Sequence, residues 1–541
     1  MGLAGHRCWM SAYISPITLA GLVCVCALTL PSLASAQDEF ETTELRSAEE
    51  YQQIISSVET MVGSGQHYEA LLDVIDILET GDSNEPYYQD AEFLAGVVLF
   101  HLKLYQSSWT YFEKVLDAEP RSIRYADTLP WLVALHQQIP GESATLERMA
   151  EYEESAYPTE MRNEIYFYVG QFHYYQDTLK SALRSLAKVD NTSVDYYLRA
   201  RYLEGVVHVR KNNAKAAANS FRSILRYERE KGLTTPTEEK IHRMGMLALA
   251  RIFYTLGQYK QDSYTTSIRY YSEIPEYSVD WLDSLLEVSW AYFQTENYGR
   301  ALGNLHTLNS PYFEDEYFPE ARVLEAVILY TNCHFDSALT SIKAFIKSYL
   351  PLFKELDNQL KVPRDSNQFY GWLARLSRGN TDMSKRLRRI FNAALTDRKL
   401  NRSFRFILAL SKEIDNLKKL SQNAPMTEFA ATLINELDAF RALQIGETGS
   451  LARSRLENVR KDLRRLLADS LKVRYETLKK QKKAIESDSD AEEKATGGND
   501  NYTVDEEHQY WPFRKEYWKD ELDSYTVGIR SKCPANKAPA R

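Results

Sequence analysis

Cysteine is scarce in this sequence. Five cysteines occur in 541 residues, and Cys8, Cys24 and Cys26 all lie within the first 36. Beyond that point only Cys333 and Cys533 remain, so the chain is not a disulfide-rich scaffold and can form at most one internal disulfide bond there. No Cys-x-x-Cys motif occurs, which removes the common zinc and redox motifs built on paired thiols.

Long apolar runs are equally rare. The longest, Ile17–Leu30, has 14 residues; it follows Arg7 and precedes the small-residue triplet Ala34–Ala36. This order predicts a secretory signal peptide over residues 1–36, with Gln37 as the first mature residue. A retained membrane anchor is the alternative, although the run is short for a bilayer span. We expect an exported protein, in a bacterial periplasm because the mature chain has few cysteines, with or without outer-membrane association.

The sequence does contain a recurring helical pattern. Each copy has an aromatic-rich helix, a short polar turn, and a second helix with a small residue near its start. In the clearest copy Gly96 allows two helices to approach closely, and Tyr105 opens the second helix. Ser108 is the small contact residue there, and Phe112 fills the core.

The other copies supply similar packing residues. These are Gly170, Ala182, Gly205, Ala217, Phe221, Tyr259, Tyr298, Ala301, Phe335 and Ala338. Their types and spacing resemble the tetratricopeptide repeat, a helix-turn-helix unit of about 34 residues. The resemblance implies an all-α fold in which residues 37–350 form a right-handed solenoid of about eight units. Such a solenoid exposes a long concave binding surface.

The small-residue positions of the second helices show where the pattern departs from regularity. They are Ala70, Ser108, Ala182, Ala217, Asp262, Ala301 and Ala338, separated by 38, 74, 35, 45, 39 and 37 residues. Because 74 is twice 37, we expect a degenerate copy in residues 121–157, with Leu135 on its first helix and Met149 on its second. Asp262 is not small and follows a long step, so the fifth junction departs most from the family pattern.

After residue 350 the pattern changes to long helices with heptad spacing. One such helix has apolar or small residues alternating three and four apart at Leu456, Val459, Leu463, Leu466, Ser470 and Val473. This spacing is typical of a supercoiled seam. A preceding helix over Arg398–Gln422 is separated from it by Asn423–Pro425. The sequence predicts a helical hairpin or small bundle over residues 351–483.

Charge differs sharply between these two parts. Residues 37–350 carry 28 Lys and Arg against 47 Asp and Glu, a net charge of −19, whereas residues 351–483 carry 29 against 15, a net charge of +14. Two interpretations stay open. The basic residues are solvated helix faces, some attracted to the acidic solenoid within the molecule, or they bind an anionic partner such as lipid head groups, an acidic polymer or an acidic protein. Nucleic acid is not an expected partner after export.

Sequence motifs for catalysis are absent. The chain has no HExxH, GxxxxGK[ST], GxSxG or GxGxxG. His101, His136, His173 and His208 follow the repeat period, with steps of 35, 37 and 35 residues. Equivalent places on successive units are roughly 10 Å apart, too far to share a metal. We therefore expect no catalytic residue, no metal and no cofactor.

The sequence thus indicates a non-catalytic scaffold for protein–protein interaction that holds envelope proteins. Leu324–Leu339 and Glu516–Cys533 are similar to segments of large bacterial envelope repeat proteins that accompany gliding-motility, secretion and outer-membrane assembly machines. Two alternatives remain. One is an enzyme acting on peptidoglycan or another wall polymer with a solenoid guide, and the other is a periplasmic chaperone. The oligomeric state is left open.

The end of the chain combines an acidic linker with an aromatic tail. Residues 484–507 are polar and acidic, which predicts disorder, whereas residues 508–541 contain several large aromatic side chains. Burying each of these contributes on the order of 2 kcal/mol, so we expect the tail to dock on the last repeats of the solenoid. Cys533 should then bond with Cys333, which lies in the turn of the last repeat. Two free thiols, or an exposed partner-binding tail, are the alternatives.

Overall fold

The computed structural model confirms the all-α class. It describes residues 46–139, 144–377, 387–388, 390–391, 397–488 and 516–533. These residues belong to one compact unit that begins at Arg46, and their regular structure is entirely helical. The expected signal peptide, with its cleavage site at Ala34, Ala36 and Gln37, lies outside the described residues, as do residues 489–515 of the linker and tail.

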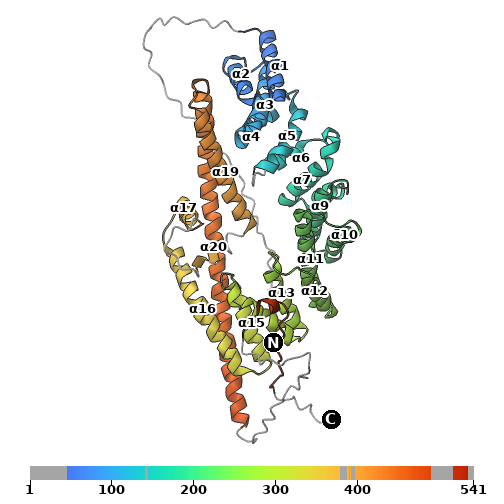
Figure 1. Cartoon of the computed structure of the whole chain (residues 1–541), viewed down its shortest axis with the longest axis vertical. Helices are drawn as coiled ribbons and strands as arrows, with labels where there is room; N and C mark the ends of the chain where they lie inside the picture. Colours follow the sequence, from blue (N-terminus) through green and yellow to red (C-terminus); the bar gives the residue numbers. More distant parts are fainter. Residues whose placement is uncertain are drawn as a thin grey trace. The chain divides into compact units, whose positions relative to one another are not determined.

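Eight helix hairpins follow one another along the described chain (Figure 1). The pairs are α1 (Ala48–Ser64) and α2 (His67–Thr80), α3 (Pro86–His101) and α4 (Tyr105–Asp117), α5 (Tyr125–Gln138) and α6 (Ala144–Glu151), α7 (Arg162–Tyr175) and α8 (Leu179–Ala187), α9 (Val194–Arg210) and α10 (Ala214–Lys231), α11 (Pro236–Gly257) and α12 (Asp262–Ser272), α13 (Trp281–Gln294) and α14 (Tyr298–Leu308), and α15 (Pro319–Thr331) and α16 (Phe335–Lys361). Each helix packs against the one before it and the one after it. We call these hairpins the array; α5 and α6 are the helix pair expected in residues 121–157.

Six of the hairpins close with the same turn. A residue with positive φ ends the first helix in each: Gly65, Lys103, Asp177, Asn212, Glu296 and Cys333. The next backbone N–H then donates to the carbonyl five residues earlier, as Leu104 does to Leu99 at 2.9 Å. This arrangement satisfies carbonyl groups that a helix end leaves without an intrahelical partner. The repeat is therefore present in the turn geometry as well as in the side chains.

Small residues bring the two helices of a hairpin together. Ser108, on α4, is fully buried, and its hydroxyl donates to the carbonyl of Gly96, 12 residues earlier, at 2.6 Å. A Cβ on Gly96 would lie 2.8 Å from the buried ring of Phe112, so only glycine fits there. Other predicted packing residues are also buried: Gly170, Ala182, Gly205, Ala217, Phe221, Ala301 and Ala338. Tyr105, Tyr298 and Phe335 are half-buried.

The α11–α12 hairpin corrects two expectations. Tyr259, expected among the packing residues, is 87% exposed, and Asp262 is also exposed. The small contact position belongs to Ser267 instead, which is fully buried and donates to the carbonyl of Ala250 at 2.7 Å. These two residues are 17 apart rather than 12, because this hairpin has five additional residues between its contact positions. The irregular step in the sequence arises mainly because α11 and α12 are longer between their contact positions and the turn, since the turn itself, residues 258–261, is only one residue longer than the turn between α3 and α4.

In the part of the chain that the structure describes, the helices with defined bounds that follow the array are α17 (Ser366–Ser377), α19 (Arg398–Leu420) and α20 (Thr427–Asp488). They continue from the array without a break, and we call them the C-terminal half. The boundary expected after residue 350 falls inside α16, which runs from Phe335 to Lys361 with Pro351 in its interior. Short 3₁₀ turns occupy Glu154–Ala156, Thr159–Met161, Pro311–Phe313, Ala424–Met426 and Lys519–Glu521. Residues 484–488, expected in the linker, are helical.

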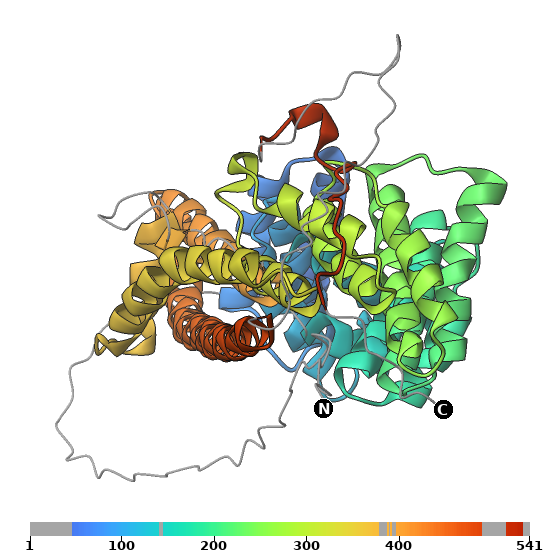
Figure 2. The ribbon, with the colours of Figure 1, turned by 90° about the horizontal axis from the view of Figure 1, so that it is seen from below.

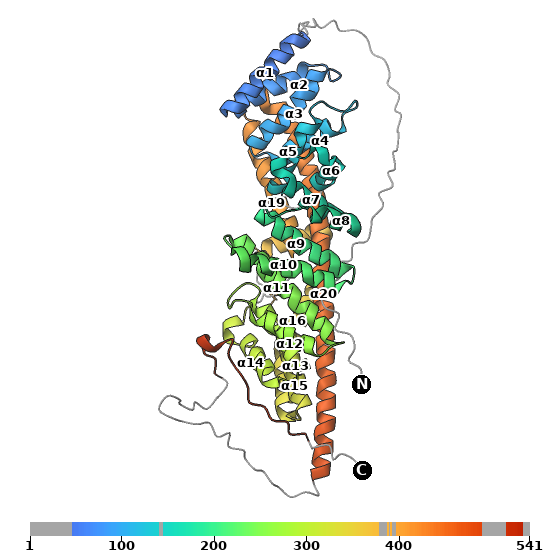
Figure 3. The ribbon, with the colours of Figure 1, turned by 90° about the vertical axis from the view of Figure 1, so that its right-hand side faces the viewer.

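Helices α19 and α20 form the predicted hairpin. They pack along each other, and α20 also packs against α15, α16 and α17 (Figures 1 and 3). Leu456, Leu463 and Ser470 of the predicted heptad seam are each at most 1% exposed. The seam is therefore filled by helices of the same chain.

The α19–α20 hairpin reaches back to the second repeat. Glu413 of α19 is 6% exposed and caps the start of α4. One carboxylate oxygen accepts the backbone N–H of Gln106 at 3.0 Å, and the other accepts the N–H and hydroxyl of Ser107 at 2.8 and 2.7 Å. Nearby, Phe429 of α20 stacks on Tyr111 at 6.1 Å. A carboxylate is well suited to this place, because the first N–H groups of a helix lack partners and carry partial positive charge.

Substituting Glu413 tests how much this long-range cap contributes. We expect Glu413→Gln to lower the free energy of unfolding by about 2–3 kcal/mol, because an NH₂ group would replace one acceptor and leave a buried donor unsatisfied. Chemical denaturation measures this. Asp415→Asn, an exposed carboxyl on the same helix, should change stability by under about 0.5 kcal/mol. Equal effects of the two substitutions would contradict the capping role.

The described part of the tail, Glu516–Cys533, packs on α14 and α15 (Figure 2). Leu522 is 2% exposed, and the Tyr517 ring stacks on His306 at 4.1 Å. The backbone N–H of Val527 donates to the carbonyl of Gly299 at 3.1 Å. Trp518, by contrast, remains 49% exposed. The tail therefore docks on the last repeats of the array, as predicted.

The sulfur atoms of Cys333 and Cys533 lie 2.06 Å apart, as a disulfide bond. The predicted pairing is thus present, and it joins residues separated by 200 positions in the sequence. In the chain-entropy model a loop of this length stabilises the fold by roughly 5 kcal/mol at most.

The tail crosses α14 at Gly303, where an added Cβ would overlap the carbonyl oxygen of Tyr525. In reduced protein, Gly303→Ala should therefore release the tail while leaving α14 helical, since alanine favours a helix more than glycine. Hydrogen exchange would then show loss of protection over residues 516–533. Gly63→Ala is the matched control, because an added Cβ there meets nothing within 4 Å. Unchanged tail protection in Gly303→Ala would refute this docking geometry.

Candidate binding site on the first helices

One position recurs on the first helix of successive hairpins and is mostly acidic. It lies six residues before the small contact residue of that helix, on a side turned away from the second helix. From α3 to α15 it is occupied by Asp90, Asp127, Glu164, Arg199, Met244, Asp283 and Glu320. Five of these seven residues are carboxylates, and we call the set the acidic row. Sequence reasoning did not single it out, although its period of about 37 residues was available.

Hydrogen bonds between neighbouring hairpins fix several members of the row. Arg124 of the third hairpin pairs with Asp90 of the second at 2.6 Å. Gln137 donates to Glu164 at 2.6 Å, and the hydroxyl of Tyr196 donates to the same carboxylate. Asp127 is 57% exposed in its side chain. The row is thus part of a polar surface that runs from one hairpin to the next.

Among the carboxylates of the acidic row, Asp283 has a strongly shifted pKa. Its residue is exposed to water, yet protein atoms crowd the carboxyl group and limit its hydration. This desolvation, together with the nearby charge of Glu287, raises the pKa of Asp283 to about 6, against the opposing effect of Arg251. Arg251 itself holds Glu287 with two bonds of 2.7 and 2.8 Å.

Basic side chains of the C-terminal half face this surface at separate points. Arg398 of α19 lies 3.6 Å from the sulfur of Met244, and Arg465 of α20 lies 3.8 Å from Glu320. Lys480 of α20 sits over the ring of Tyr330, on α15, at 4.2 Å. Part of the positive charge of the C-terminal half is therefore directed at the array within the same molecule, as one of the two interpretations expects.

The periodic histidines make contacts within their own neighbourhoods. His136 and His173 hydrogen-bond through Nδ1 to the hydroxyls of Thr145 and Thr178, at 2.9 and 3.1 Å. His101 stacks on His67 at 4.5 Å. Within the described ranges, no three His, Cys, Asp or Glu side chains are arranged to hold a metal ion.

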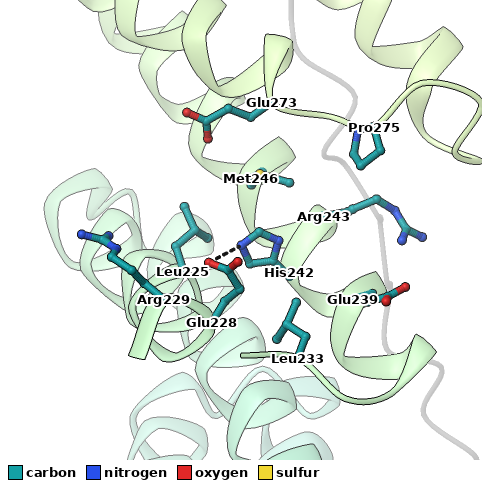
Figure 4. Close-up of a pocket in the computed structure, with 10 residues that line it drawn as sticks. All are labelled: Leu225, Glu228, Arg229, Leu233, Glu239, His242, Arg243, Met246, Glu273 and Pro275. Atoms are coloured by element: carbon teal, nitrogen blue, oxygen red, sulfur yellow. Dashed lines mark ion pairs between the residues drawn. The ribbon is translucent and has the colours of Figure 1, made fainter. Parts of the chain in front are cut away.

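A pocket of about 610 Å³ opens between α10, α11 and the connection after α12 (Figure 4). Leu225, Leu233 and Met246 supply its apolar wall, and charged side chains surround His242. His242 lies 4.0 Å from Glu228, and burial lowers its pKa. The side chains of Glu228 and Glu273 are 44% and 47% exposed, so neither is held in the dry environment that sets up a buried acid catalyst. The only sequence signal near this pocket is the 45-residue step from Ala217 to Asp262 at the fifth junction.

Comparison with known proteins assigns no family. The chain matches no protein-family model, and no curated protein is significantly similar to it. Among the helices that the structure describes, none is long and apolar enough to cross a membrane. The tetratricopeptide resemblance consequently depends on the repeat pattern.

Acid should destabilise the array through His136. Burial, aided by the nearby charge of Arg402, lowers the pKa of His136 to about 4, whereas an unfolded histidine titrates near 6.5. Between these values the unfolded state binds more protons, so stability falls as pH decreases from about 6.5 to about 4. The difference in unfolding free energy between wild type and His136→Gln should shift by up to about 3 kcal/mol over this range. Denaturation curves at several pH values measure the shift, and a constant difference would contradict it.

Proposed function

We propose that this protein is a non-catalytic binding scaffold of the tetratricopeptide-repeat kind, which holds other proteins of the bacterial envelope. The observation that carries the proposal is the acidic row. Carboxylates at equivalent positions of five of the seven first helices offer acceptors along the array, and such a series fits an extended segment with basic side chains.

Two connections between distant parts of the chain support this function. Glu413 fastens the α19–α20 hairpin to α4, and the disulfide fastens the tail to the turn between α15 and α16. Both connections link parts that are distant in sequence, so the array is supported by more than the contacts between neighbouring hairpins. A surface fixed in this way loses less conformational entropy when a partner binds. The disulfide also fits an oxidising compartment such as the periplasm.

Two members of the row, Asp127 and Asp283, are the places for a partner. Arg465 approaches Glu320, and Arg398 approaches Met244, so the C-terminal half covers part of the surface near those residues. Asp127 and Asp283 are both exposed. A partner with lysine or arginine side chains would meet these two carboxylates from solvent.

Affinity capture from detergent-extracted envelopes tests the proposal. Wild-type protein should capture a reproducible, selective set of envelope proteins. Asp127→Asn combined with Asp283→Asn should reduce that capture about tenfold, since two exposed charge pairs are worth about 0.7 kcal/mol each. Asp415→Asn with Glu428→Gln, two exposed carboxyls on α19 and α20, is the matched control and should leave capture unchanged.

Three other results would each reject the proposal. Purification without any reproducible companion would remove the scaffold function. Indiscriminate capture of unfolded proteins, unaffected by either pair of substitutions, would favour a chaperone. Hydrolysis of purified cell wall would favour an enzyme.

A further inference from the structure

The second half of α20 has an inner face that other described helices cover and an outer, apolar face that the described residues leave exposed. On the inner face Leu463, Ser470 and Thr477 are each at most 1% exposed, against α15 and α16. On the outer face the exposed fractions are 53% for Leu471, 63% for Tyr475, 45% for Leu478 and 67% for Ile485. Among the residues described, 14 large hydrophobic side chains are exposed, and four of them fall within these 15 positions. Such concentration marks an interaction surface rather than scattered surface residues.

The outer face has the spacing of a coiled-coil seam. Leu471, Tyr475, Leu478 and Ile485 are separated by four, three and seven residues, and Ala468 and Lys482 complete the alternation. At 100° per residue the four exposed apolar side chains span an arc of only about 80°. A stripe this narrow matches one facing helix. We call it the outer seam.

The orientation of the outer seam is fixed by contacts on other sides of α20. Gln481 donates to Asp336, at the start of α16, at 2.9 Å. Lys480 lies over the ring of Tyr330. These contacts hold the inner face against the array, and the end of α20 extends past α15 in two perpendicular views (Figures 1 and 3). At 100° per residue the outer seam is centred about 100° around α20 from Ser470, so it points to one side of the helices that cover the inner face.

Basic side chains flank the seam. Lys472, Arg474 and Lys479 lie beside its core positions, and Lys482 lies within it. In all, residues 468–486 carry six Lys and Arg against three Asp and Glu. The flanking positions of a coiled coil decide its partner through charge, so this seam favours a helix with acidic flanks.

The same charges oppose a second copy of the chain. In a parallel pair Arg474 would face Lys479 of the second copy, and the two Lys482 side chains would meet in the core. In an antiparallel pair centred on this segment, Lys479 would face its own counterpart. A membrane surface is disfavoured too, because interfacial helices present a broad apolar face, whereas this one is narrow and contains Lys482.

We infer that the outer seam of α20 is a docking site for an amphipathic helix with acidic flanks, supplied by a partner protein. This adds a second binding surface, opposite in charge to the acidic row and independent of it. Failure of one proposal would leave the other standing.

Two synthetic 21-residue peptides test the inference. Both carry leucine at the seam positions, but one has glutamate and the other lysine at the flanking positions. The glutamate peptide should bind the full-length protein at least tenfold more tightly than the lysine peptide. Leu471→Gln with Leu478→Gln should weaken its binding at least tenfold, and glutamine keeps α20 helical. Leu443→Gln, at a 58% exposed leucine elsewhere on α20, is the matched control and should not weaken it.

Hydrogen exchange should show protection by the glutamate peptide confined to residues 468–486. Equal binding of both peptides, no binding, or an equal loss in Leu443→Gln would overturn the inference. So would a concentration-dependent dimer abolished by Leu471→Gln with Leu478→Gln, which would assign the seam to a second copy. Binding to vesicles containing phosphatidylglycerol that is lost in the same variant would assign the seam to lipid.

Discussion

The buried carboxylate of Glu413 is the contact on which this structure depends most. Helical repeat arrays are stabilised by contacts between neighbouring units, so any point along them can open without breaking distant contacts. Here one side chain joins α19 to the first turn of α4, more than 300 residues earlier. Because both of its oxygens accept hydrogen bonds, separating the two elements would leave buried donors unsatisfied. The tail adds a second long-range closure through the Cys333–Cys533 bond.

The opposite net charges of the array and the C-terminal half attract each other within the molecule. The array is acidic and the C-terminal half is basic, and Arg465 beside Glu320 shows them meeting inside one molecule. The pairing is incomplete, however. Asp127 and Asp283 remain exposed on the array, and the outer seam of α20 keeps exposed basic flanks. In our proposals the charges left over after folding are the charges available to partners.

Features encoded by local sequence could be predicted. Three such features are the hairpins, the close contact at Gly96 and the break between α19 and α20. Each depends on a few residues that are close in sequence and of types that favour that structure. The Cys333–Cys533 pairing could be predicted because only two cysteines follow residue 36. Features set by three-dimensional proximity could not be predicted in the same way. Glu413 has the sequence surroundings of an ordinary exposed helix residue, and nothing near it in the chain identifies α4 as its partner.

Errors in the prediction also have physical causes. Asp262 was assigned to the small contact position because the hairpin was assumed to have its usual length, whereas additional residues in α11, in α12 and in their turn move that position to Ser267. The boundary at residue 350 was placed where the repeat pattern faded, yet α16 continues because its later turns pack against α20. The acidic row was missed because a carboxylate on a helix surface is unremarkable until equivalent positions are aligned.

Native-state hydrogen exchange under increasing denaturant tests the central claim most directly, namely that the C-terminal half braces the array. If Glu413 and its surroundings join the two elements, the amides of α4 and α19 should open in one cooperative step with the same free energy. A simple neighbour-coupled array would behave differently. Opening of α4 together with α3 and α5, at a free energy distinct from that of α19, would contradict the account.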